Sequence, residues 1–241
     1  MSYNEQNTHP RDSRLSFEPE SHTYTVDGRT FRSVTTVIGD LFEKFDADYW
    51  ANKKATPSRP AEQIKQEWEA KAQAGRELGT EMHDRIEKYY LGADVTPWLN
   101  DPTYRHFCAF THEYQLVPYR SEWPIFIEEY DIAGTVDFLA DNGDGSLDLW
   151  DWKRSSNLID GNGNTITANR WGKTGLHPIT DIPDTSFHHY ALQLSIYRHI
   201  LETKYGLKIR KAQLGVFHPY NSTYYVVEVP YLSVAVKNIL K

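Results

Sequence analysis

Residues 132–154, IAGTVDFLADNGDGSLDLWDWKR, constrain the fold of this chain more than any other stretch. Residues 132–140 and 147–153 are apolar-rich runs. The segment DNGDGS between them supplies the Gly and Asn residues that tolerate positive φ in a hairpin turn. The sequence therefore predicts a β-hairpin, and the rest of the chain is expected to support it or to add residues to its site.

Three charged side chains of this hairpin are predicted to lie together. Side chains alternate between the faces of a strand, so Asp151 and Lys153 share one face, while Trp150 and Trp152 point to the other. Asp137 lies in the middle of the partner strand, where a buried carboxylate is costly unless it is paired or bound to a metal. Two acidic oxygens suit Mg²⁺, and a nearby ammonium can stabilise charge on a phosphate. The alternative is an exposed hairpin with an Asp151–Lys153 ion pair worth about 0–1 kcal/mol.

Composition narrows the class of protein. With 241 residues, 39% of them hydrophobic, the chain is long enough for one domain with a full core. A single cysteine excludes an intrachain disulfide, a four-cysteine zinc site and a cysteine-ligated iron–sulfur cluster. No apolar run fits a signal peptide or a bilayer span, so we expect a cytoplasmic protein without membrane contact. The net charge of −7 excludes binding of polyanions by bulk charge, but local basic clusters can still bind nucleic acid.

The part of the chain before residue 60 is predicted to support the hairpin. Residues 1–14 are polar, and we expect them to be disordered or loosely attached. Alternating residues on both sides of Asp27-Gly28 predict a tight hairpin, and Ser33 is placed to cap a short helix. We interpret residues 15–60 as a support or substrate-flanking element of a single domain that covers residues 15–241.

The clearest helix is predicted at residues 60–91, where a buried stripe follows the helical period. Gly75 and Gly79 lie within this stripe, and each costs about 1 kcal/mol relative to Ala in a helix. We therefore expect them to let another backbone or a substrate approach closely. His83 lies one turn beyond Gly79, either facing what approaches or satisfied beside the core.

Further elements are predicted around the hairpin. Residues 100–116 favour a helix, and residues 119–130 favour a strand that enters the hairpin and completes a three-stranded meander. Glu122 near the start of this strand is either an extra carboxylate of the site or an exposed strand end. Residues 186–206 predict a buried helix, with Gln193 and Tyr197 one turn apart on one face.

Residues 154–185 form a long Gly-, Asn- and Pro-containing insertion directly after Lys153. Connections of this length within a domain are usually functional or mobile. The insertion carries a basic segment next to the predicted site, with an aromatic ring that can stack on a base. Its candidate DNA-binding residues are Arg154, Arg170, Trp171 and Lys173. The alternative is a solvated loop.

Four short motifs, GTEMH, GTVD, DWK and QLSIY in this order, resemble the RecB-like nuclease family of the PD-(D/E)XK superfamily. The family includes the nuclease domain of RecB, CRISPR-associated exonucleases, the mitochondrial genome-maintenance exonuclease and many phage exonucleases, which act in DNA repair and recombination. The resemblance covers residues 62–231. It implies an α/β fold in which helices flank a central mixed sheet with a restriction-endonuclease-like core.

The resemblance also implies roles for single residues. Four side chains would be metal ligands: His83, Glu122, Asp137 and Asp151. Lys153 would be the catalytic lysine beside the two aspartates, and Gln193 and Tyr197 of the family's Q-x-x-x-Y motif would hold the substrate and the lysine in place. The cysteine cluster of some CRISPR-associated members is absent, so no iron–sulfur cluster is expected.

The sequence thus predicts a Mg²⁺- or Mn²⁺-dependent deoxyribonuclease, an exonuclease that hydrolyses phosphodiester bonds of single-stranded DNA or DNA ends with metal-activated water. Without an NTPase motif, it would work without ATP or beside a recombination or replication partner protein. Two alternatives stay open. One is a non-catalytic DNA-binding protein of the same fold, and the other is a carbohydrate hydrolase that uses Asp137 and Asp151 as acid and base.

Overall fold

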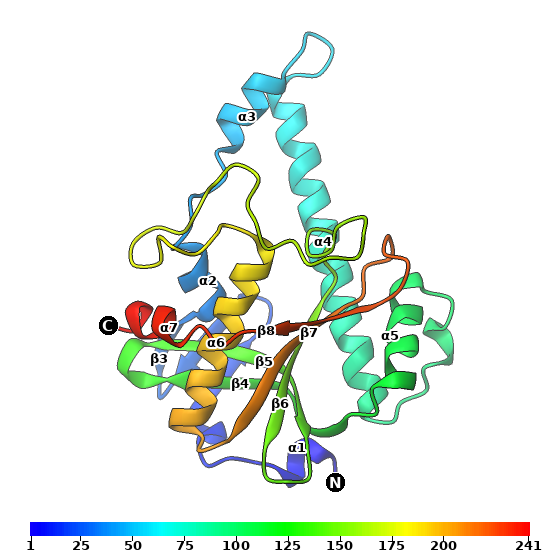
Figure 1. The fold of residues 1–241 in the computed structure, drawn as a ribbon, viewed down its shortest axis with the longest axis vertical. Coiled ribbons are helices and arrows are strands. Elements are labelled where there is room, and N and C mark those ends of the chain that lie inside the picture. The colour runs from blue at the N-terminus through cyan, green and yellow to red at the C-terminus, as the bar shows by residue number, and fades with distance from the viewer.

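The computed structural model describes residues 1–241 and has an α/β architecture, with helices on both faces of an eight-stranded mixed sheet (Figure 1). The strand order is β1-β2-β3-β5-β6-β7-β8, and β4 pairs with β5. The strands are β1 (Leu15–Glu18), β2 (Thr23–Val26), β3 (Arg29–Ser33), β4 (Val117–Ile127), β5 (Ile132–Asp141), β6 (Leu147–Lys153), β7 (Ile209–Val216) and β8 (Tyr225–Val229). The coarse fold prediction, a mixed sheet flanked by helices, is confirmed.

The predicted central hairpin is formed by β5 and β6, which pair antiparallel from Phe138↔Trp150 to Asp141↔Leu147. Strand β4 pairs antiparallel along β5, which confirms the predicted meander. Strand β3 pairs in parallel only with residues 132 and 133 of β5, so β3 and β6 share the edge of β5 that faces away from β4. Between these two contacts, residues 134–137 have no strand partner on that edge.

The helices divide into two groups around the sheet (Figure 1). Their bounds are α1 (Tyr3–Gln6), α2 (Val34–Gly39), α3 (Ala47–Lys54), α4 (Ala61–Tyr90), α5 (Pro102–Glu113), α6 (Ser186–Lys204) and α7 (Ser233–Ile239), with short 3-10 turns at Asp12–Arg14, Thr96–Trp98 and Glu128–Tyr130. Helices α2, α6 and α7 share the larger core with the sheet. The end of α4 and α5 pack on the other face through an aromatic cluster that includes Trp150 and Trp152. None of the helices is long and apolar enough to cross a membrane.

The N-terminal hairpin forms as predicted. Strands β2 and β3 pair antiparallel around Asp27 and Gly28, whose φ angles are 49° and 80°. These are the left-handed conformations of a two-residue turn that matches the strand twist. Ser33 caps α2, since its Oγ accepts a hydrogen bond from the Thr36 amide at 3.0 Å.

Residues 1–14 differ from the expected disordered or loosely attached segment, because polar side chains tie them to β4. Asp12 accepts hydrogen bonds from the guanidinium of Arg120 at 2.9 Å and from the indole of Trp123 at 2.8 Å. Arg11 donates to Glu128 at 2.7 Å, and its guanidinium lies 4.0 Å from the centre of the Phe126 ring. The polar composition that indicated disorder instead reflects long-range ion pairs, whose partners lie over 100 residues away in sequence.

Glu128 should therefore stabilise the attachment of the N-terminal segment. Burial would raise the pKa of Glu128, but hydrogen bonds from Arg11 and Arg14 outweigh it and lower the pKa from 4.5 to about 2. A lowered folded pKa adds stability that is complete above the unfolded pKa and is lost as the pH falls toward the folded one. We expect Glu128→Gln to lower the free energy of unfolding by about 1 kcal/mol at pH 7, since the pairs are partly exposed.

Urea denaturation of wild type and Glu128→Gln at pH 7 and at several values between 4.5 and 2 measures this contribution. The difference should shrink as the pH falls through that window. Glu20→Gln is a matched control, because Glu20 is exposed and makes no ion pair. A difference that is constant with pH would contradict the ion-pair explanation.

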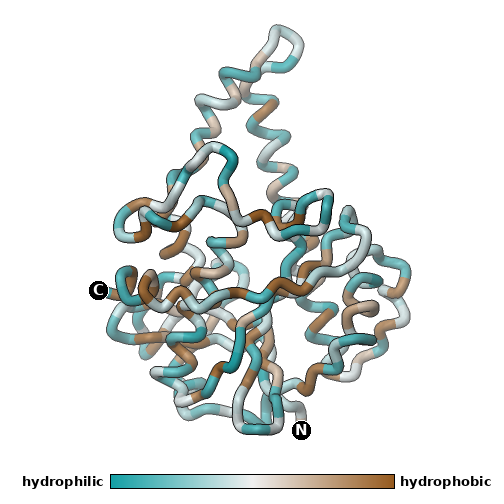
Figure 2. Tube along the Cα trace, in the orientation of Figure 1, coloured by the Kyte–Doolittle hydropathy of each residue, from teal (hydrophilic) through white to brown (hydrophobic).

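Helix α4 confirms the predicted helix but not the predicted buried stripe. Its buried residues are Ile64, Met82 and Ile86, whereas residues 69–78 are all exposed. Helices α3 and α4 project together from the sheet as an arm (Figure 1), and Figure 2 shows that polar residues dominate it. A Cβ added at Gly75 or Gly79 would meet no atom within 4 Å, so no protein backbone approaches them. Periodicity alone cannot tell a stripe that faces a core from one that faces solvent.

The predicted insertion, residues 154–185, contains no helix or strand apart from the isolated bridges Ile159↔Thr165 and Thr174↔Pro183. It is nevertheless anchored, because Leu158, Ile179 and Ile182 are buried in the larger core. The insertion therefore has fixed ends and a middle that lies on the surface beside α2 and α3 (Figure 1).

Candidate metal centre and lysine cluster

The candidate site is organised by the backbone of Trp152 on β6. The Trp152 amide donates a hydrogen bond to Asp137 Oδ2 at 2.8 Å, and its carbonyl oxygen accepts one from His83 Nε2 at 3.0 Å. One peptide segment thus positions a carboxylate from β5 and an imidazole from α4. Because Nε2 donates to a carbonyl, Nδ1 is the nitrogen that points to the carboxylates.

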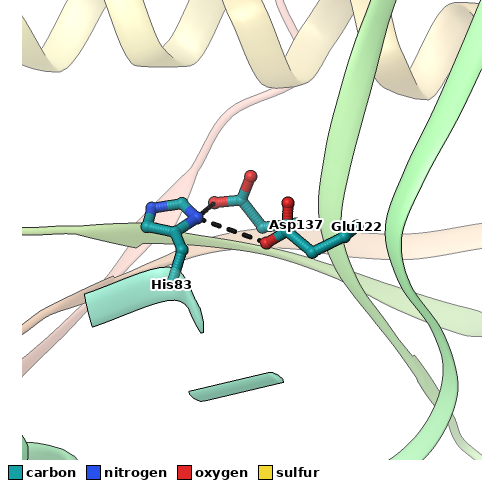
Figure 3. Close-up of side chains that lie close together, drawn as sticks. All are labelled: His83, Glu122 and Asp137. Atoms are coloured by element: carbon teal, nitrogen blue, oxygen red, sulfur yellow. Dashed lines mark hydrogen bonds and ion pairs between the residues drawn. The ribbon is translucent and has the colours of Figure 1, made fainter. Parts of the chain in front are cut away.

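His83, Glu122 and Asp137 offer ligand atoms that all lie within 4.8 Å of one another. His83 Nδ1 is 3.4 Å from Glu122 Oε1 and 3.7 Å from Asp137 Oδ2. Figure 3 draws both contacts as dashed lines. The three residues come from α4, β4 and β5, so only tertiary packing brings them together. One imidazole nitrogen and several carboxylate oxygens form a donor set that fits Mn²⁺ and Mg²⁺.

Glu122 reaches this group through an unusual backbone conformation. Its φ is +43°, in the left-handed region that non-glycine residues rarely adopt. The neighbouring pairs Ser121↔Phe138 and Trp123↔Val136 place Glu122 opposite Asp137 across the β4–β5 ladder. Backbone conformations of this kind cost of order 1–3 kcal/mol and cluster at functional sites. The observation favours the interpretation of Glu122 as a site residue rather than as an exposed strand end.

A second cluster surrounds Lys153 at the end of β6. Lys153 Nζ lies 2.5 Å from Asp151 Oδ2 and 4.7 Å from the centre of the Tyr190 ring on α6. Gln193 Nε2 is 3.3 Å from both Asp151 Oδ1 and the Tyr197 hydroxyl. The ammonium is thus held by a carboxylate and an aromatic face, and the amide of Gln193 fixes the carboxylate.

Charge is concentrated in this buried region, and it shifts several pKa values. Burial would lower the pKa of His83, but Asp137 and Glu122 outweigh burial and raise it to about 9. Burial raises the pKa of Asp137, and burial together with the charge of Asp137 raises that of Asp151. Burial would lower the pKa of Lys153, but the two aspartates raise it, so Lys153 remains charged. The carboxylates create a strong local preference for positive charge, as a divalent cation site requires.

Asp151 lies outside the group of three ligands and pairs instead with Lys153. It is 1% exposed, and its carboxylate repels that of Asp137. Of the four side chains that the resemblance implies as metal ligands, His83, Glu122 and Asp137 therefore lie together, whereas Asp151 lies apart from them. Asp151 can still act on the same substrate as these three residues, because Asp151 and Lys153 both lie at the end of β6.

Tyr197 crosses β5 at Gly134, the glycine of the GTVD motif. A Cβ added at Gly134 would lie 2.6 Å from Tyr197 Cε1 and 2.8 Å from its hydroxyl. No sequence pattern other than the motif itself predicts a glycine here. Its lack of a side chain lets the buried tyrosine pack against the strand and reach Gln193.

We expect Gly134→Ala to lower the free energy of unfolding by about 1–3 kcal/mol, since the new methyl group would displace a fully packed ring. Urea denaturation measures the effect. Gly75→Ala is the matched control, because its Cβ meets no atom and the change should stabilise the exposed helix by up to about 1 kcal/mol. Equal effects of the two substitutions would contradict the close contact.

The structure divides the candidate DNA-binding residues. Arg154 lies by the contact of α4 with α5, where its Nε donates to Thr103 Oγ1 at 3.4 Å. Arg170, Trp171 and Lys173 lie together in the exposed middle of the insertion and line a groove with residues of α3. The four residues are thus separated into two locations rather than forming one basic segment.

An open pocket of about 330 Å³ lies beside His83 and Glu122. Its other walls include Tyr24 of β2, Gly79 of α4 and Thr135 of β5, and the Tyr24 hydroxyl lies 3.0 Å from Thr135 Oγ1. No sequence motif indicates a site role for Tyr24. Tyr190 lies three residues before Gln193, so helical spacing alone places it on the same face as Gln193.

No family model and no curated protein matches this chain. Among solved structures, SSO0001 is 14% identical to it, covers 66% of this chain and 68% of its own, and has a TM-score of 0.28. A likeness this low carries no argument about function. Fold and site therefore define the class of protein: an α/β protein with a mixed sheet flanked by helices, which gathers an imidazole, three aspartate or glutamate side chains and a lysine around the β5–β6 hairpin.

Proposed function

We propose that this protein is a metal-dependent deoxyribonuclease with a PD-(D/E)XK-type core, acting as an exonuclease. The observation that carries the proposal is the ion pair of the partly buried Lys153 with the buried Asp151, two residues apart on β6, next to the buried Asp137 on the paired strand β5. An ion pair at this depth beside a second buried carboxylate is costly for folding alone. Its retention is explained if the carboxylates hold a cation and the lysine acts on a phosphate.

The residues present fit Mg²⁺ or Mn²⁺, which would supply an activated water and neutralise charge on the phosphate. His83, Glu122 and Asp137 would hold the ion. Lys153 remains charged and stabilises negative charge on the phosphate as it reacts, since a compact ammonium approaches one oxygen without the steric demand of a guanidinium. Gln193 and Tyr197 orient Asp151, and through it the lysine.

End-labelled single- and double-stranded DNA, labelled at either end and incubated with Mg²⁺, Mn²⁺ or EDTA, tests the proposal. We expect metal-dependent release of short products, with EDTA abolishing cleavage. Binding without cleavage under every metal condition would favour the non-catalytic DNA-binding alternative. Hydrolysis of oligosaccharides in the presence of EDTA would favour a carbohydrate hydrolase instead. The label position that disappears first gives the strand polarity, and internal products would indicate an endonuclease.

The resemblance alone suggests that such a nuclease takes part in DNA repair or recombination, in a phage or a cell, beside a recombination or replication partner protein. Co-purification of the chain with a recombination or replication protein bound to DNA would test this pathway context. It is independent of the cleavage assay, because an active nuclease need not have a partner.

A further inference from the structure

A groove of about 530 Å³ lies between the insertion and residues 45–54, which include α3. Three aromatic rings and three cationic side chains line it, and no carboxylate does: Phe45, Trp50, Lys54, Arg170, Trp171 and Lys173. The net charge of the chain is −7, whereas the charged side chains that line this groove are all positive. The groove is separate from the metal centre, none of whose ligands line it.

The aromatic rings of this groove are exposed rather than part of a core. Trp171 is 72% exposed, Phe45 65% and Trp50 38%. Three large rings that face solvent in one concavity mark a surface that binds something. Cations accompany them, since the Arg170 guanidinium lies 4.8 Å from the centre of the Trp171 ring and Lys53 Nζ lies 4.9 Å from that of Trp50.

Contacts at both walls hold the groove in shape. Lys173 of the insertion pairs with Glu43, just before α3, at 2.7 Å. Asn169 Oδ1 accepts a hydrogen bond from the Trp171 amide at 2.8 Å, and the Phe45 ring lies edge-on to Trp68 of α4 at 5.4 Å. The insertion and the arm are thus joined across about 130 residues of sequence. A ligand would meet rings already in position, which lowers the entropy cost of binding.

We propose that this groove binds single-stranded nucleic acid, with bases stacked on Trp50 and Trp171 and phosphates paired with Lys54 and Arg170. The combination of exposed aromatic faces and cations suits a strand whose bases are free to unstack. A duplex keeps its bases stacked inside and offers only phosphates to such a groove. The inference rests on the proposed function and narrows its substrate class to a single strand delivered toward the β5–β6 site.

The position of the insertion supports this role, because it begins directly after Lys153. Its residue Leu158 is buried in the larger core, so the start of the insertion is fixed beside the candidate site. The groove at the middle of the insertion would then hold the strand at a set distance from the lysine. Arg170, Trp171 and Lys173 act here with α3, a partner that the sequence did not indicate.

Fluorescence anisotropy in EDTA with labelled dT20 and a labelled 20-base-pair duplex tests the proposal without cleavage. Trp50→Ala and Trp171→Ala should each weaken dT20 binding by about tenfold or more, with little effect on the duplex. Lys54→Gln and Arg170→Gln should each reduce the salt dependence of dT20 binding by a slope of about 0.7. Tyr220→Ala, with a ring 90% exposed elsewhere, and Lys237→Gln are the matched controls. Circular dichroism confirms that each variant is folded.

Unchanged affinity for dT20 in both tryptophan variants would overturn the proposal. Equal losses for dT20 and duplex would also overturn it and assign the groove to duplex DNA, and no binding of either probe would assign it to a ligand of another class. Cleavage is measured separately, so failure of the proposed function stays distinguishable. Loss of dT20 binding in the tryptophan variants, together with no metal-dependent cleavage by the wild type, would support the proposed groove and contradict the proposed nuclease function.

Discussion

Replacing Lys153 with alanine should lower the rate of DNA cleavage by at least about a hundredfold while leaving DNA affinity nearly unchanged. Removal of one preorganised group that stabilises transition-state charge typically costs about 10²–10³ in kcat. Lys153 is partly buried and paired with Asp151, so we expect it to contact a phosphate mainly when the substrate reacts beside it. An interaction made mainly in the transition state appears in kcat rather than in binding.

The Lys153→Ala protein should remain folded, although its Asp151 loses its partner. Burial and Asp137 already raise the pKa of Asp151 to about 7, and without the ammonium it would rise further. Asp151 would then take up a proton, which removes the uncompensated charge. Single-turnover cleavage and anisotropy, together with a thermal denaturation curve, measure rate, affinity and folding on the same samples.

Two further substitutions make this prediction specific. Lys153→Arg keeps the charge, but its planar head is larger than an ammonium in a pocket bounded by Tyr190 and Asp151, so it should also remain largely inactive. Lys211→Ala on the neighbouring strand β7 is the matched control and should cleave at the wild-type rate. A Lys153→Ala protein as active as the wild type would refute the proposed mechanism.

Asp137→Asn should abolish both metal binding and metal-dependent cleavage. Asp137 is the buried member of the ligand group and is shared by His83 and the Trp152 amide. An amide oxygen keeps the hydrogen bond from that amide but removes the negative charge that a divalent cation requires. The fold should therefore persist, whereas the affinity for Mn²⁺ should fall.

Thermal denaturation with and without Mn²⁺ measures this effect independently of activity. A ligand that binds only the folded state at 100 times its Kd stabilises it by about 2.7 kcal/mol, so the wild-type midpoint should rise with Mn²⁺ and that of Asp137→Asn should not. Asp84→Asn is the matched control, since Asp84 follows His83 on α4 but is exposed and pairs with Lys88. Equal Mn²⁺ shifts in wild type and Asp137→Asn would contradict the metal centre.

Local sequence patterns were sufficient to predict the elements whose signals lie within a few residues of one another. The turn at Asp27-Gly28, the cap at Ser33 and the β5–β6 hairpin follow from turn and capping chemistry that neighbouring residues supply. The alternation of side chains also placed Asp151 and Lys153 on one face correctly, because period-two geometry does not depend on the rest of the fold.

The exposure of α4 and the attachment of residues 1–14 could not be predicted in this way. Apolar periodicity in α4 indicates which face of the helix is apolar but not what covers that face. Residues 69–78 are all exposed, so no other element covers the face there. The charges of the N-terminal segment look like those of a disordered chain until Arg120 and Glu128 are seen beside them. Partners distant in sequence leave no local signal.

By itself, the sequence determined the hairpin, helices α2, α4, α5 and α6 and the chemical types of the site residues, because strand alternation, helical period and turn residues act over short distances. Only the tertiary structure decided that Glu122, through its left-handed backbone, completes the group of His83 and Asp137 while Asp151 pairs with Lys153. It also decided that the insertion and α3 share one groove. The physical reason is the same in each case: which side chains converge depends on how separate elements pack, and packing distances are not encoded in the spacing of residues along the chain.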